Sequence, residues 1–156
     1  MFSLLEFLGR FMLINAGEKA IEHAALEAGG KMFLEKAKAA IGTYEYGWPP
    51  LAQSTIDRKT TGDSPLLETG EMKDSGFYEV HHGEVIVAFS DPKLVYHEWG
   101  TRHHPPRPVI GGTIDHHGQE IADHIGVVFG TILGETLAVG SLAVATSNVL
   151  GGHSHS

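Results

Sequence analysis

Histidine and carboxylate side chains recur at helical spacing late in the chain. His116, Glu120 and His124 follow one another at intervals of four residues, so a helix would present them on one face. Two imidazoles and a carboxylate at this spacing can bind zinc, and a three-ligand site with an open position can activate water. The simpler interpretation is a solvated helix face with Ile121 and Ile125 buried behind it, because the segment lacks the HExxH order of zinc hydrolases. We favour that interpretation and expect no metal ion and no cofactor.

No other pattern of reactive residues points to an enzyme. The chain has no cysteine, which excludes disulfides, thiolate metal sites and cysteine nucleophiles. It contains neither a Gly-x-Ser-x-Gly nucleophile elbow nor a Gly-x-x-x-x-Gly-Lys phosphate-binding loop. We therefore expect a non-enzymatic protein with no catalytic residues.

Composition and charge are those of a globular protein that does not bind nucleic acid tightly. Apolar residues make up 42% of the 156 residues and charged residues 19%, as in folded domains. The formal net charge is −8, whereas tight binding to phosphates needs lysine and arginine to release counterions. Any contact with DNA would be passing rather than adhesive.

The first part of the chain has the periodicity of helices. Apolar residues at three- and four-residue intervals predict a helix over residues 4–12. We expect Asn15-Ala16-Gly17 to interrupt it and a longer helix to cover residues 18–41. Its charged residues Glu27, Lys31, Glu35 and Lys38 form a solvated stripe. Gly29-Gly30 would permit a kink or a close backbone approach.

The middle of the chain changes to the twofold periodicity of strands. Short helices are expected over residues 53–58 and 70–75, the second with Thr69 as its N-cap. Residues 77–80 and 84–89 flank His81-His82-Gly83, a pattern typical of a tight β-hairpin. Both faces of the second strand are apolar, which predicts that both are covered.

The last part of the chain returns to helical periodicity. Residues 94–99 predict a short helix that Gly100 ends, and the prolines at 105–108 predict an extended segment. A final helix is expected to begin near Asp115. The fold class is therefore α+β, with N-terminal helices, a small antiparallel sheet and a C-terminal helix. We assign residues 1–125 to one domain and residues 126–156 to a Gly/Ala-rich extension with a frayed His/Ser tail.

Three segments, taken in order, carry a family resemblance. They are WPPLAQSTIDRK (48–59), LLETGEMKDS (66–75) and YHEWGT (96–101) followed by PPRP (105–108). With a hairpin between the second and third, they resemble the virion morphogenesis, or tail completion, proteins of tailed bacteriophages. These proteins are head–tail connector or neck components, also described as minor tail proteins. The resemblance covers roughly residues 47–125, and we refer to the three segments as the first, second and third motif segments.

The resemblance implies a structural subunit of a ring between the head connector and the tail. Its partners would be copies of itself, portal-side and tail-tube proteins, and passing DNA in the bore, in a virion assembled in the host cytoplasm. The family supplies no catalytic set and no cofactor. Structural roles are expected at its motif positions: Thr69 and Gly70 at a helix start, Trp99 and Gly100 at a helix end, and Pro106, Arg107 and Pro108 in a subunit contact.

The C-terminal stretch departs from the family pattern, in which the chain ends soon after the last helix. Residues 125–150 carry one charge, Glu135, and repeat glycine at 126, 130 and 134, a spacing that lets another helix approach closely. We expect burial against other subunits to order this stretch. A membrane span is the less favoured alternative, since Glu135 would lie near its centre.

Overall fold

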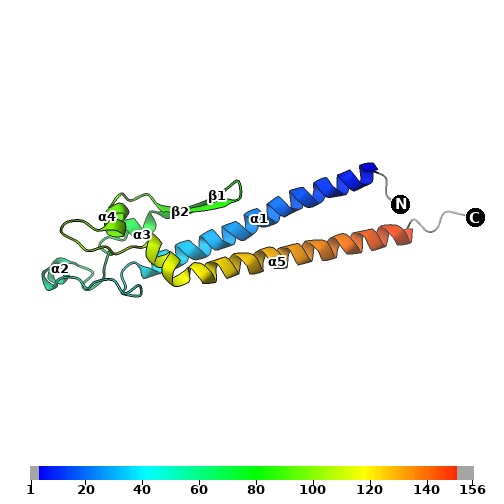
Figure 1. The fold of residues 1–156 in the computed structure, drawn as a ribbon. Helices are drawn as coiled ribbons and strands as arrows, with labels where there is room; N and C mark the ends of the chain where they lie inside the picture. Colours follow the sequence, from blue (N-terminus) through cyan, green and yellow to red (C-terminus); the bar gives the residue numbers. More distant parts are fainter. Residues whose placement is uncertain (1–3, 151–156) are drawn as a thin grey trace, which may run out of the picture.

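The molecule is a long antiparallel helical hairpin with a small α+β head at one end (Figure 1). The computed structural model describes the backbone of residues 4–150 and the side chains of residues 17–138. Helix α1 (Leu4–Ala40) and helix α5 (Ile110–Leu150) form the hairpin and pack against each other. Helices α2 (Gln53–Arg58), α3 (Glu71–Asp74) and α4 (Lys93–Trp99) and strands β1 (Gly76–His81) and β2 (Glu84–Phe89) form the head. The predicted α+β class is confirmed.

Helix α1 is continuous through Asn15-Ala16-Gly17, so the predicted interruption there is wrong. A glycine inside a helix costs about 1 kcal/mol relative to alanine. Without a proline, a cost of this size does not end a helix with helix-forming residues on both sides. The chain therefore has one long N-terminal helix instead of two shorter ones.

Gly29 and Gly30 confirm the predicted close approach. A Cβ atom at Gly29 would lie 2.4 Å from two side-chain carbons of Ile125 in α5. A Cβ atom at Gly30 would lie 2.6 Å from Val85 of β2 and 3.0 Å from Tyr78 of β1. The two glycines thus let α1 contact α5 on one side and the β-hairpin of β1 and β2 on the other.

Strands β1 and β2 form a two-stranded antiparallel sheet in which Tyr78 pairs with Val87. Its turn residues His82 and Gly83 both have positive φ, 46° and 80°, as a type I′ hairpin turn requires. One face packs on α1, but Ile86 on the other face is 49% exposed. The expectation that both faces are covered is therefore wrong, because no second layer lies over the sheet within the described residues.

Two predicted helix starts are shifted. Helix α3 begins at Glu71 with Gly70 as its N-cap, at a φ of 84°, whereas the exposed Thr69 hydroxyl receives only a 3.4 Å hydrogen bond from the Glu71 N–H. Helix α5 begins at Ile110, so the expected start near Asp115 is wrong by more than a turn. Helices α2 and α4 lie where short helices were expected, and Gly100 ends α4 with a φ of 72°.

The core lies where the base of the helical hairpin meets the head. Its buried side chains come from the end of α1, from the turns that follow it and from the short elements of the head: Ala37, Ala40, Ile41, Tyr46, Trp48, Met72, Phe89, Leu94 and Val109. Helix α5 runs without a break across the predicted boundary at residue 125. The predicted frayed tail lies outside the described residues.

Candidate functional site

Arg107, from the third motif segment, is bonded to the first motif segment. Its Nε donates to the Pro49 carbonyl at 3.0 Å and its Nη2 donates to the Pro50 carbonyl at 3.1 Å. The residue is only 7% exposed. We expected the guanidinium to contact a neighbouring subunit. Within the described chain it joins two segments of its own chain, and the subunit contact stays a prediction.

Glu98, in the third motif segment, caps helix α5. Its Oε1 accepts hydrogen bonds from the N–H groups of Val109 and Ile110, both at 2.6 Å, and its Oε2 accepts one from Gly111 at 3.3 Å. The first N–H groups of a helix have no partner within the helix, and a carboxylate there also interacts favourably with the helix dipole. Helix α5 therefore begins at Ile110 because a side chain of α4 satisfies these groups.

Two further contacts hold the proline segment in place. The indole Nε1 of Trp48 donates to the Pro108 carbonyl at 3.2 Å. A Cβ atom at Gly100 would lie 2.8 Å from the backbone nitrogen of Pro106, so the chain can fold back here only with glycine at this position. The contacts of Trp48, Glu98, Gly100 and Arg107 together form what we call the motif junction.

The second motif segment meets the other two at a pocket. The cavity has a volume of about 500 Å³, and residues of all three motif segments line it, with Asp91 and Lys93 between the second and third. Thr69 and Gly70 lie in its wall with Arg107. The resemblance gave these residues structural roles but did not predict that they would share one cavity.

Helix α4 exposes an apolar face beside the motif junction. Val95 is 59% exposed, Tyr96 62% and Trp99 82%, and their spacing places them on neighbouring positions of one helix surface. Single exposed apolar residues are ordinary, but a contiguous group marks an interaction surface. Trp99 thus ends α4, as predicted, with its ring in solvent.

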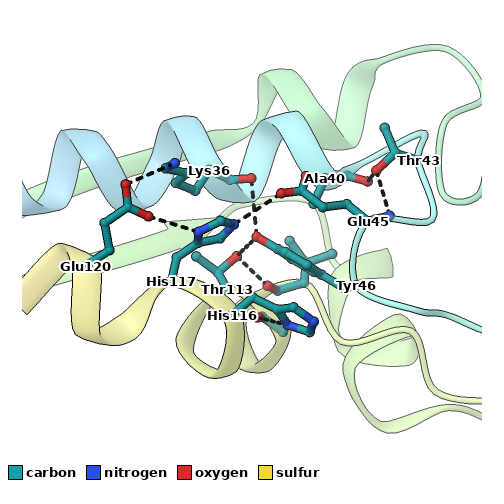
Figure 2. A network of polar contacts seen from close by, with 11 residues as sticks. Lys36, Ala40, Thr43, Glu45, Tyr46, Thr113, His116, His117 and Glu120 are labelled. Atoms are coloured by element: carbon teal, nitrogen blue, oxygen red, sulfur yellow. Dashed lines mark hydrogen bonds and ion pairs between the residues drawn. The ribbon is translucent and has the colours of Figure 1, made fainter.

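A polar network joins the two long helices at the base of the hairpin (Figure 2). His117 of α5 has both ring nitrogens 3.2 Å from carboxylate oxygens, Nδ1 from Glu120 and Nε2 from Glu45. Lys36 of α1 forms an ion pair with Glu120 at 3.4 Å. The hydrogen bond from His117 and the ammonium of Lys36 hold the pKa of the Glu120 carboxyl below its usual range.

Tyr46 and Thr113 form the buried part of the same network. Their hydroxyl oxygens lie 2.8 Å apart, and the Thr113 hydroxyl also donates to the Val109 carbonyl at 2.8 Å. Burial raises the pKa of the Tyr46 phenol. His116 stacks on the Tyr46 ring with centroids 4.7 Å apart. No local sequence pattern predicted this contact, since its partners lie far apart in the chain.

The predicted histidine face does not form a metal site within the described side chains. His116, Glu120 and His124 do lie on one helix, but the His116 Nδ1 lies 3.0 Å from the Gly112 carbonyl and Glu120 is bonded to His117 and Lys36. Between residues 17 and 138 no group of three potential ligands converges. The predicted burial of Ile121 is confirmed.

Helix α5 is mostly exposed over residues 126–138, the last residues whose side chains the structure describes. The segment from Ile110 to Ala138 is long enough to cross a membrane, and within it an 18-residue apolar window has a mean hydropathy of 1.3 and is only 6% buried. A Cβ atom at Gly126, Gly130 or Gly134 would meet nothing within 4 Å. This side of α5 is therefore open within the described chain.

Comparison with known proteins adds no relative. No protein-family model, no curated protein and no solved structure matches the chain.

Proposed function

We propose that this chain is a structural subunit of a tailed-phage virion. It forms a ring of identical copies at the neck, joins the portal side to the tail tube and lets DNA pass through the bore. It has no cofactor and no catalytic residues, it is found at the head–tail junction, and it assembles in the host cytoplasm. The chemistry is that of surface complementarity, in which identical subunits bury one another's exposed faces.

The observation that carries the proposal is that residues of the motif segments hold distant parts of the chain together. The first and third motif segments meet at the motif junction, where Trp48 and Arg107 bond residues 60 and 58 positions away and Glu98 caps helix α5. A segment tied down this firmly supports the rigid presentation of the neighbouring α4 face. The exposed Trp99 on that face is the type of residue that anchors protein interfaces.

The experiment is to replace Trp99 with serine and follow ring formation. The side chain is 82% exposed, so the variant should fold, and its circular dichroism and melting temperature should match those of the unsubstituted protein. Negative-stain images and light scattering should show rings for the unsubstituted protein and monomers for Trp99→Ser. Ile114→Ser, a change at a 55% exposed residue of α5, serves as the matched control. Rings of normal yield from Trp99→Ser would exclude the α4 face, and a monomeric unsubstituted protein would count against the ring.

A second candidate function rests on the apolar part of α5. The supporting observation is the length of the Ile110–Ala138 segment and its apolar window, of which only 6% is buried. The protein would then be a membrane-associated phage protein anchored by residues 125–150. Glu135 opposes this, because an acidic side chain at the bilayer centre costs about 2.5–3.5 kcal/mol on the insertion scale. Flotation with lipid vesicles separates the two functions: a ring subunit stays in the aqueous fraction, and an anchored protein floats.

A further inference from the structure

The pocket shared by the motif segments is lined by titratable side chains of both signs, and Arg107 is the buried one among them. Arg107 is almost fully buried there, and Lys59 and His97 are half-buried. A guanidinium has five N–H donors, and Arg107 uses two of them on the carbonyls of Pro49 and Pro50. The Lys59 ammonium donates to the Ser64 carbonyl at 2.6 Å. Neutral oxygens thus receive the hydrogen bonds of both cations.

These cations have no carboxylate partner among the side chains of residues 17–138. The ion pairs found in that range are Lys36 with Glu120, His81 with Glu79, and His117 with Glu45 and Glu120. Glu68 and Glu71 also line the pocket but are exposed, and the Asp91 carboxylate accepts a hydrogen bond from the Lys93 N–H at 2.9 Å. A buried charge without an opposite charge is costly.

The positive charges of the pocket act on His97. Burial lowers the pKa of His97, and the nearby positive charges of Arg107, His104 and Lys59 lower it further, opposed by Asp91. Burial also lowers the pKa of Lys59. Among the charges around Lys59, Glu68 acts most strongly and raises the pKa, whereas Arg107 lowers it. An anion in the pocket would reduce the repulsion among all these groups.

We propose that this pocket binds an oxyanion, either a carboxylate or a phosphate group, on Arg107, Lys59 and His97. Arginine and lysine are the side chains that bind both groups through charge-assisted hydrogen bonds. A cavity of about 500 Å³ is large enough for a small anion or for an acidic side chain of another chain. This proposal does not depend on the ring proposed above.

The test is a titration of the full chain with inorganic phosphate and, separately, with succinate, at ionic strength held constant with sodium chloride. The His97 ring signals in NMR spectra should shift on saturation, and the pH midpoint of His97 should rise, because a bound anion favours the protonated ring. Tighter binding of phosphate identifies a phosphate ligand, and tighter binding of succinate identifies a carboxylate ligand. If neither anion moves the His97 signals, the site does not exist.

Lys59→Gln should weaken binding about tenfold, as expected for the loss of one charge-assisted hydrogen bond. Lys73→Gln makes the same change on α3 at a residue that does not line the pocket, and should leave the dissociation constant unchanged. Equal affinity in both variants would overturn the assignment to this pocket. The His97 titration of the unsubstituted protein decides the question even if Lys59→Gln does not fold.

Discussion

Glu98→Ala removes the carboxylate that caps α5 and should destabilise the fold. Three N–H groups, those of Val109, Ile110 and Gly111, lose their acceptor. Loss of an N-cap costs about 0.5–2 kcal/mol, and the charge–dipole interaction contributes up to about 2 kcal/mol where it is partly buried. Since Glu98 is half-buried, the two effects together lower the free energy of unfolding by about 3 kcal/mol.

Thermal and urea unfolding followed by circular dichroism measures this loss. For a chain of this length, 1 kcal/mol shifts the melting temperature by roughly 2–4 °C, so Glu98→Ala should melt about 6–12 °C lower. Glu98→Gln keeps an acceptor oxygen but loses the charge, so it should lose about half as much stability. Glu27→Gln, a change at an exposed residue of the α1 stripe, should stay within about 0.5 kcal/mol of the unsubstituted protein.

The relative stabilities of the Glu98 variants test whether the carboxylate caps α5. If Glu98→Ala lowers stability by less than about 1 kcal/mol, the carboxylate does not cap α5 in solution. If Glu98→Gln is as damaging as Glu98→Ala, the charge and not the hydrogen bonds provides the stabilisation.

Three further predictions test the packing and the electrostatics. Gly112→Ala should lower the free energy of unfolding by about 2 kcal/mol through overpacking, because its Cβ atom would lie 2.6 Å from the Tyr46 ring. Gly126→Ala on the same helix meets open space and should raise the free energy of unfolding by up to about 1 kcal/mol. The opposite order in urea unfolding would contradict the α5 packing. Arg107→Lys should cost about 2 kcal/mol in the same assay, since an ammonium lacks the fork that reaches both proline carbonyls; an unchanged midpoint would rule the fork out. The folded state disfavours protonated His97. The unfolded state therefore binds more protons as the pH falls below about 6.5, and the free energy of unfolding decreases with pH. His97→Gln should reduce this dependence of stability on pH between pH 7.5 and 5.5, and an identical dependence would contradict the burial of a neutral ring.

Local patterns predicted the elements of this fold that local interactions determine. The spacing of apolar and charged residues located most of α1, Gly100 marked the end of α4, and the His82-Gly83 dipeptide located the hairpin turn. Each of these elements is specified by residues a few positions apart, as period and turn rules require. The glycine pair in α1 was also interpretable, because adjacent glycines inside a helix have a packing or conformational reason.

The errors came where a distant side chain decides the outcome. Nothing near Ile110 marks a helix start, because the cap is Glu98, which lies in another helix. One face of β2 is exposed because no layer covers it within the described residues. The apolar pattern of the strand does not show whether such a layer exists. For the motif residues, the resemblance implied structural roles at particular positions. It did not give Arg107 its partners, because these are backbone carbonyls that any residue carries.

The pairing of the first helix with the last constrains how the chain folds. The contact of Gly29 with Ile125 closes a loop that contains the entire head. The entropy of closing a loop must be lost before its contacts form, so pairings distant in sequence form late and slowly. During synthesis, the surface of α1 that packs on α5 stays exposed until α5 has left the ribosome. The interval before the hairpin closes is thus the period in which the nascent chain is most prone to aggregate.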